Sequence, residues 1–251
     1  KASETQKEKS KSLEQIIMGI DFKTPAEVVE DNGIKMCVYG HAGVGKTVLC
    51  TTTGAPTLMI SAEAGLLSIK DAKNVSVIEV QSLAQVQEVF KHLRDNPREF
   101  EWVCLDSITE IADQVLAVEK LKNKDNLRGA YGDMANKVIP MIKAFRDLPM
   151  NVVFTAQLDL KKDEASGSML YTVNAPGQQV SQKLPYHVDI VCAQRTILNQ
   201  EGKLERWLLT QPDGQWSAKD RSGKLAMWEE PNLAALKAKV IAKKPAVKKA
   251  A

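Results

Sequence analysis

The sequence predicts an α/β fold, with a mostly parallel central sheet flanked by helices and an antiparallel hairpin toward the C-terminus. The first observation behind this prediction is that apolar, strand-like runs alternate with segments whose apolar residues recur at helical spacing, the pattern of parallel βαβ units. The second is the size and composition of the chain. Its 251 residues, 44% of them hydrophobic and 26% charged, are sufficient for a buried core without disulfides or structural metals.

Five apolar runs are the expected parallel strands: 34–39, 57–61, 75–80, 102–106 and 151–156. The segments between them predict helices. One starts at Lys46 and ends before Gly54 and Pro56. A second is capped by Ser82 and carries an apolar face at helical spacing. Two more are expected over 108–122 and over 134–148, where Pro140 is a candidate kink.

Two polar segments are expected to be loops, 123–133 with its two glycines and the longer 158–179. Beyond them, the runs 188–198 and 204–210 flank 199–202, which predicts a hairpin that adds antiparallel strands to the sheet.

The chain is expected to contain one folded domain between two polar ends. Residues 1–33 form a partly flexible lead-in, with a short helix over 13–20 and a polar connection over 21–32. The domain occupies 34–242, including a final helix that Pro231 opens, and 243–251 is a basic disordered tail. The last 16 residues hold six lysines and no acid, and such a tail either binds nucleic-acid backbone or is a solubilising end.

Composition excludes several classes of protein. No apolar run approaches the ~20 residues that a membrane helix needs, and no signal-peptide core is visible, so no membrane association is expected. No Cys-x-x-Cys pair occurs among the four cysteines, which predicts buried thiols in a reducing cytoplasm. The three histidines are far apart in the sequence, so no histidine metal site is expected. These cysteines and histidines are Cys37, Cys50, Cys104, Cys192, His41, His92 and His187.

One motif carries specific chemistry. It follows the first strand, opens the first helix and fits the pattern G-x-x-x-x-G-K-[ST] of a phosphate-binding P-loop. Its residues are Gly40, His41, Ala42, Gly43, Val44, Gly45, Lys46 and Thr47. The glycines let successive backbone N–H groups curl around a phosphate. Lys46 is expected to reach the β/γ-phosphates of ATP and Thr47 to bind Mg²⁺.

A nucleotide-hydrolysing site also needs a second Mg²⁺ carboxylate and a group that polarises water. Asp106, at the end of the fourth strand, is the expected carboxylate, although an Asp there can also simply cap the next helix. Ser107 stands where many P-loop ATPases place a catalytic Glu, so Glu63 after the second strand is the preferred base and Glu110 the weaker one. Glu63 could instead be a solvated loop acid. Gln157 ends the fifth strand and is either a γ-phosphate sensor or an ordinary surface residue.

In this order, the P-loop, Glu63, Asp106-Ser107 and Gln157 resemble RecA-like ATPases. The likeness extends over roughly 34–236. Within the RecA-like ATPases, the chain more closely resembles the compact phage-encoded recombination ATPases, including those classed as single-strand annealing proteins. The segment 184–191 is also similar to such phage proteins. The resemblance implies a RecA-like P-loop core with Lys46 and Thr47 as nucleotide ligands.

The same resemblance implies further roles. The DNA loops of such proteins correspond to 123–133 and 158–179, whose basic residues are Lys124, Arg128, Lys161 and Lys162. Acidic residues (Asp159, Asp163, Glu164) dilute the positive charge of the second loop. Lys219 and Arg221 are candidates to reach a neighbouring subunit's nucleotide, or else belong to a solvated turn.

The resulting expectation is an Mg²⁺-dependent ATPase of the cytoplasm (the host cytoplasm if phage-encoded). It would bind single-stranded DNA, assemble into a ring or filament and promote annealing or strand exchange, with a single-stranded-DNA-binding protein as a further candidate partner. Two alternatives stay open: a P-loop ATPase that remodels or loads a protein without touching DNA, and a slow nucleotide-dependent switch.

Overall fold

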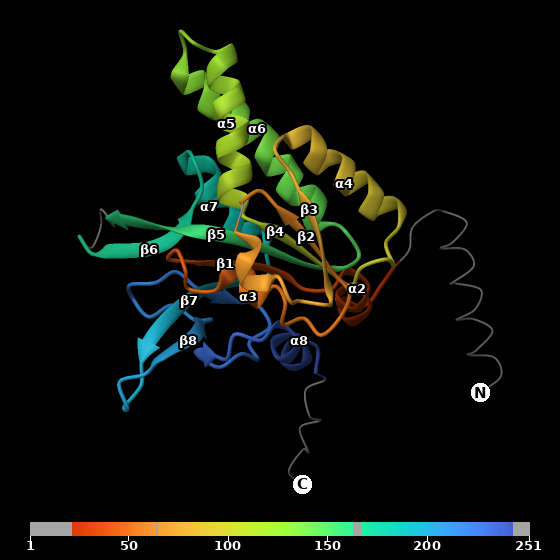
Figure 1. Ribbon diagram of the computed structural model, residues 1–251, viewed down its shortest axis with the longest axis vertical. Helices are drawn as coiled ribbons and strands as arrows, with labels where there is room; N and C mark the ends of the chain where they lie inside the picture. Colours follow the sequence, from red (N-terminus) through yellow and green to blue (C-terminus); the bar gives the residue numbers. More distant parts are fainter. Residues whose placement is uncertain (1–21, 64, 163–166, 243–251) are drawn as a thin grey trace, which may run out of the picture.

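The computed structural model describes residues 22–63, 65–162 and 167–242, and within these the strands form a single ten-stranded sheet (Figure 1). Its main path runs β10-β8-β7-β1-β5-β4-β2-β3, while β6 pairs with β5 and β9 with β7. The strands are β1 (Lys35–Gly40), β2 (Thr57–Ser61), β3 (Val75–Glu79), β4 (Trp102–Asp106), β5 (Asn151–Lys162), β6 (Met169–Asn174), β7 (Ile190–Leu198), β8 (Leu204–Leu209), β9 (Lys219–Asp220) and β10 (Trp228–Glu229).

Strands β3, β2, β4, β5, β1 and β7 are parallel, and β8 and β10 continue the sheet antiparallel. The predicted fold class, a mostly parallel sheet flanked by helices with a C-terminal antiparallel hairpin, is confirmed. The central strands β1, β2 and β4 are buried at every position, because helices cover both of their faces.

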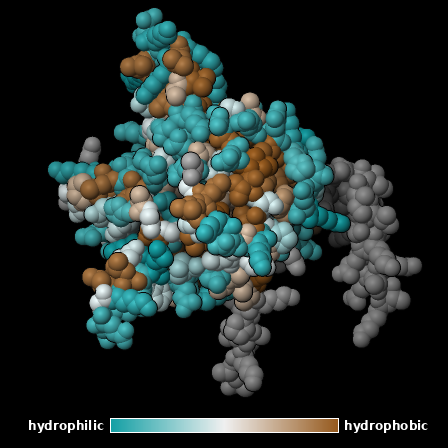
Figure 2. Space-filling model, viewed as in Figure 1, coloured by the Kyte–Doolittle hydropathy of each residue, from teal (hydrophilic) through white to brown (hydrophobic). Residues whose placement is uncertain are grey.

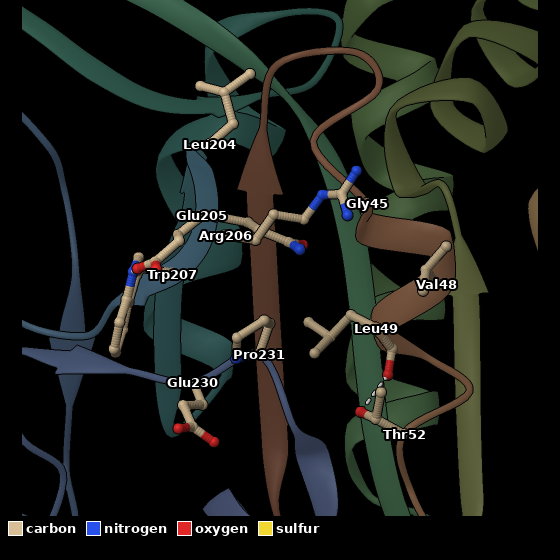
Figure 3. Close-up of a pocket in the computed structure, with 11 residues that line it drawn as sticks. Gly45, Val48, Leu49, Thr52, Leu204, Glu205, Arg206, Trp207, Glu230 and Pro231 are labelled. Atoms are coloured by element: carbon tan, nitrogen blue, oxygen red, sulfur yellow. Dashed lines mark hydrogen bonds between the residues drawn. The ribbon is translucent and has the colours of Figure 1, made fainter. Parts of the chain in front are cut away.

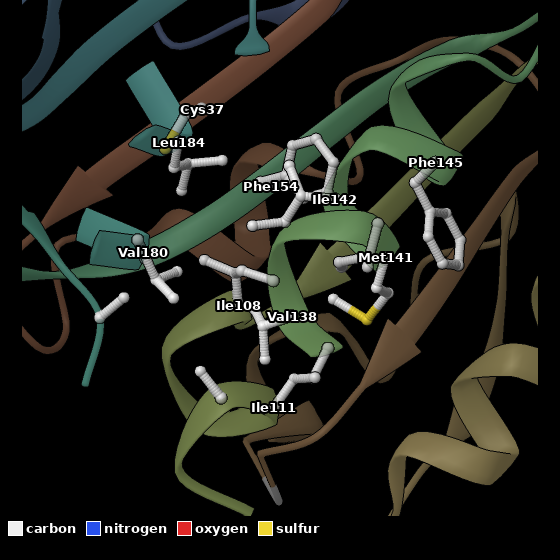
Figure 4. Packing of buried hydrophobic residues seen from close by; sticks show 14 of the residues in the cluster. Cys37, Ile108, Ile111, Val138, Met141, Ile142, Phe145, Phe154, Val180 and Leu184 are labelled. Carbon is white, nitrogen blue, oxygen red and sulfur yellow. The ribbon is translucent and has the colours of Figure 1, made fainter. Parts of the chain in front are cut away.

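Helices pack on the two faces of the sheet (Figure 1). On one face, α4 (Leu83–Asp95), α5 (Ile108–Lys122), α6 (Leu127–Arg146) and α7 (Gln178–His187) contribute to the larger apolar core. Figure 4 shows part of that core, where Ile108 and Val138 lie between the helices and the sheet. On the other face, α3 (Lys46–Leu49), the 3₁₀ turn η1 (Leu66–Ile69) and α8 (Leu233–Ile241) enclose a second core. The four cysteines are buried free thiols, as expected.

The lead-in contains a helix where a polar connection was predicted. The helix α2 (Pro25–Asn32) is fixed by a capping box, in which the Glu27 carboxylate accepts from both the backbone N–H and the hydroxyl of Thr24 at 2.7 and 2.8 Å. Pro25 at the first helical position suits this start, because its missing N–H has no helical partner to lose. The predicted helix over 13–20 and the basic tail 243–251 lie outside the described residues.

The prediction of a loop over 123–133 was wrong for most of its length, because α6 begins at Leu127. Asn126 caps it by accepting from the Gly129 N–H at 2.8 Å. An ideal Cβ on Gly129 would come within 2.6 Å of Asn126 Nδ2, so this glycine makes room for the cap and does not break the helix. The helix also continues through Pro140.

The prediction of a loop over 158–179 was also wrong. The strand β5 continues to Lys162 and pairs antiparallel with β6, in the register Gln157↔Asn174 to Lys162↔Met169. The apolar–polar alternation from Leu158 onward is the strand signal that the glycine, serine and lysine content obscured. The helix α7, which sequence reasoning did not anticipate, follows β6.

Candidate functional site

The P-loop leaves the carboxyl end of β1 and turns on glycines. Gly43 and Gly45 have positive φ angles of 74° and 102°, which side chains with a Cβ rarely adopt. The Lys46 ammonium folds back over the loop and donates to the carbonyls of Gly40 and His41, both at 3.0 Å. The motif residues thus form a loop with the Lys46 ammonium held against its backbone, an arrangement that suits a phosphate-binding loop.

The two expected Mg²⁺ ligands are in direct contact. The Thr47 hydroxyl donates to Asp106 Oδ2 at 2.7 Å, and the carboxylate is 3% exposed. The buried Thr155 hydroxyl on β5 donates to the other oxygen, Oδ1, at 2.5 Å and so fixes the plane of the carboxylate. A hydroxyl and a carboxylate are the hard oxygen donors that Mg²⁺ prefers. No cluster of three or more His, Cys, Asp or Glu side chains that could hold a metal occurs in the described ranges.

The candidate base is placed beside this pair. Two residues past the end of β2, Glu63 accepts from the buried Ser107 hydroxyl at 2.5 Å. Burial lowers the pKa of Lys46, while the nearby Glu63 and Asp106 carboxylates act in the opposite direction. Because β2 and β4 are neighbouring parallel strands, their carboxyl ends bring Glu63 and Asp106 to the same edge as the P-loop.

The weaker candidate, Glu110, lies in the first turn of α5, where its backbone N–H donates to the Ser107 hydroxyl at 3.2 Å. Burial raises its pKa, and the carboxylates of Asp113 and Glu63 add to the effect. Both acids therefore lie within each other's electrostatic reach, and Glu63 is the one in contact with the hydroxyl that follows Asp106.

Gln157 lies one strand from the P-loop, opposite Gly40 in the β1–β5 register. Its side chain is exposed, and its backbone N–H donates to the Thr109 hydroxyl at 3.0 Å. This residue marks the point at which β5 leaves the parallel sheet and becomes one arm of the β5–β6 hairpin.

The two expected intersubunit cations lie away from the P-loop of their own chain. Lys219 and Arg221 lie beside the beginning of β7, the opposite end of the sheet from the loop. The Lys219 ammonium donates to the carbonyls of Pro185 and Val188 of its own chain, and its role in another subunit stays a prediction. Arg221 pairs with Asp189 at 3.4 Å and its role in another subunit stays a prediction.

The candidate DNA-binding cations occupy two projections. Lys124 and Arg128 are exposed at the end of the α5–α6 helical hairpin, which extends away from the body (Figure 1). Lys161 and Lys162 lie on β5, and Lys161 is engaged by Ser181 Oγ at 3.0 Å and Asp159 at 3.4 Å. Lys162 is exposed. Lys124 lies in the short turn that remains of the first expected loop, whereas Arg128 lies on α6 and the other two lysines on β5.

Sequence reasoning missed a pocket of about 440 Å³ next to the P-loop (Figure 3). Its walls come from α3, β7, β8 and the segment before α8, and its lining residues are Gly45, Val48, Leu49, Thr52, Gln194, Leu204, Glu205, Arg206, Trp207, Glu230 and Pro231. Gln194 Nε2 donates to the backbone carbonyl of Val44, a buried residue of the P-loop, at 3.2 Å. Ala42, two residues earlier in the loop, is exposed. The sequence signal was a polar Gln inside the apolar run of β7, a position that is 2% exposed.

An aromatic cluster, also missed, connects the P-loop with the β5–β6 hairpin. His41 meets the ring of Trp216 edge-on at 6.3 Å, and Trp216 stacks on Tyr171 of β6 at 4.3 Å between centroids. Arg195 lies over Trp216 at 4.6 Å and pairs with Asp213 at 3.0 Å. These residues are dispersed in the sequence, so no local motif announces them.

Comparison with known proteins identifies a family for this chain. A family model described as an AAA domain matches residues 32–222. No curated protein matches the sequence. Among solved structures, a KaiC-like protein from the hyperthermophilic archaeon Pyrococcus horikoshii matches with 12% identity and a TM-score of 0.38, over 71% of this chain and 78% of that one. None of the helices in the described ranges is long and apolar enough to cross a lipid bilayer.

Proposed function

The chain belongs to the AAA domain family, and from that premise we propose that it is an Mg²⁺-dependent ATPase of the RecA-like recombination class. The observation that carries the proposal is the convergence of three features at one edge of the sheet: the P-loop with Lys46, the Thr47–Asp106 pair, and Glu63 held by Ser107. Such an arrangement supplies charge neutralisation, metal ligands and a base, the parts that phosphoryl transfer to water requires.

In the proposed reaction, the P-loop amides and Lys46 hold the β- and γ-phosphates of ATP. Bound Mg²⁺ would neutralise charge that develops on the phosphate oxygens. The oxygen of the attacking water forms a bond to the γ-phosphorus while Glu63 takes a proton from that water. The bond between the γ-phosphorus and the oxygen that bridges to the β-phosphate breaks, which leaves ADP and phosphate. Thr155 keeps Asp106 oriented toward Thr47 throughout.

The proposal extends to single-stranded DNA, annealing or strand exchange, and a ring or filament of subunits. Its support is the continuity of β5, which runs from Gln157 beside the P-loop to the exposed Lys162. A change at the γ-phosphate can therefore be transmitted along one strand to a basic projection. Lys124 and Arg128 on the α5–α6 hairpin supply a second exposed basic surface.

One observation favours a second candidate, an ATPase that remodels a protein partner. Figure 2 shows apolar side chains among polar ones at the projecting end of α5–α6. Leu121 and Leu127 are 71% and 57% exposed there. Exposed apolar clusters of this kind are typical of protein-interaction sites.

The rate of ATP hydrolysis with and without single-stranded DNA separates these candidates. Stimulation by DNA supports the recombination function, and a substantial rate that DNA does not change supports the protein remodeller. A negligible rate under both conditions, with nucleotide binding intact, would leave only a nucleotide-dependent switch. Electron microscopy of the chain with ATP and single-stranded DNA then tests the ring or filament.

A further inference from the structure

Arg206 reaches the P-loop from a distant part of the sequence. It lies on β8, and Figure 3 shows its side chain crossing from this strand toward Gly45. An ideal Cβ on Gly45 would lie 3.3 Å from both Cδ and Nε of Arg206. The side chain of Arg206 therefore packs directly on the backbone that precedes Lys46.

The guanidinium of Arg206 is uncommitted. Within the residues that the structure describes, it makes no hydrogen bond or ion pair, although Glu205 precedes it. The Glu205 carboxylate accepts instead from Asn199 at 2.9 Å and from Trp207 Nε1 at 3.2 Å. By contrast, Arg195 on the neighbouring strand is paired with Asp213 and stacked on Trp216. An unpaired guanidinium beside a phosphate-binding loop is suited to bidentate contact with phosphate oxygens.

A second observation at the same place also points to a ligand. Gln194 is 2% exposed and lines the pocket beside Arg206, and its Oε1 has no hydrogen-bond partner in the described structure. Its Nε2 is 3.4 Å from the Cβ position of Gly45 and is committed to Val44, which fixes which way the amide faces. A buried acceptor without a donor is rare in native proteins, and those that occur call for an explanation such as a ligand. A guanidinium offers five N–H donors, enough to serve this acceptor and a phosphate together.

We propose that Arg206 is a nucleotide-binding residue of this chain, whose guanidinium contacts the phosphates of the nucleotide held by the P-loop of the same subunit. The inference rests on the proposed function and deepens it. It places a second cation of the site on β8 of the same subunit, in addition to Lys46. The pocket that Arg206 lines is also lined by Gly45 of the P-loop and by Val48, the residue directly after the loop.

The test is equilibrium binding of a fluorescent ADP or ATP analogue to the full chain, with adenosine as a competitor that lacks phosphates. Arg206→Ala is expected to weaken binding of the analogue at least tenfold. The inhibition constant of adenosine should be unchanged. Arg206→Lys keeps the charge but not the fork, and it should recover part of the affinity. Lys203→Ala is the matched control, because it removes an exposed cation from the same hairpin, and it should bind as the wild type does.

The outcomes distinguish this inference from the function on which it rests. A wild-type chain that binds no nucleotide, or a Lys46→Ala variant that binds as tightly as the wild type, overturns the proposed nucleotide site. If Lys46→Ala loses binding and a folded Arg206→Ala binds within twofold of the wild type, only the role of Arg206 is overturned. An equal loss in Lys203→Ala would show a general charge effect and would also overturn it.

Discussion

Replacing Glu63 by Gln isolates the proposed base from its structural contacts. The amide oxygen of Gln can still accept the 2.5 Å hydrogen bond from Ser107, and the side chain keeps its length, so fold and nucleotide affinity should be preserved. The ability to take a proton from water is lost. A positioned general base typically contributes ~10²–10⁴ in rate, which corresponds to about 2.7–5.4 kcal/mol of activation free energy.

The assay is steady-state ATP hydrolysis, with nucleotide binding measured on the same preparation. Glu63→Gln should bind ATP at least as well as the wild type, because a negative charge near the γ-phosphate is removed, and it should turn over at least about a hundredfold more slowly. Glu110→Gln is the matched control, since it removes the neighbouring carboxylate from the first turn of α5. Normal turnover in Glu63→Gln together with a slow Glu110→Gln would refute the assignment and transfer the role to Glu110.

Three further predictions concern the metal, the helical projection and the tail. Thr155→Val removes the buried hydroxyl that orients Asp106, and by analogy with other second-layer ligands it should raise the Mg²⁺ concentration for half-maximal hydrolysis about 10–100-fold; an unchanged Mg²⁺ titration would contradict it. Asn126→Ala removes the cap of α6 and should lower the free energy of unfolding by about 1 kcal/mol in urea denaturation, whereas no change would mean that the cap is dispensable. Ending the chain after Ala242 removes four lysines. If these lysines contact phosphates, the slope of the logarithm of the single-stranded DNA binding constant against the logarithm of salt concentration should become shallower by up to about 3. An unchanged slope would show that the tail is only a solubilising end.

The sequence was sufficient for the parallel core and for the P-loop because both depend on local patterns. Apolar runs of strand length gave β1, β2, β3, β4 and the first half of β5, and the glycine spacing identified the phosphate loop. The second half of β5 was missed because all of its side chains are exposed or half-buried, so it has no continuous apolar run. In α6, Gly129 suggested a loop, although it serves a helix cap.

The parts of the site that escaped prediction depend on long-range contacts. Thr155 is an unremarkable polar residue until β5 is paired beside β4, which brings its hydroxyl to Asp106. Arg206 is more than a hundred residues from Gly45 in the sequence and reaches it only through the order β8-β7-β1 in the sheet. The intersubunit role expected of Lys219 stays a prediction, since the single chain shows only its hydrogen bonds to its own carbonyls.

The central claim is that this chain hydrolyses ATP at the loop that Lys46 closes. The most direct test compares ATP turnover by the purified wild type with that of Lys46→Ala, with circular dichroism to establish that both are folded. We expect Mg²⁺-dependent hydrolysis in the wild type and its loss in the variant, because the ammonium now bound to the Gly40 and His41 carbonyls is the charge that neutralises the β/γ-phosphates. A folded Lys46→Ala variant with wild-type turnover would contradict the account.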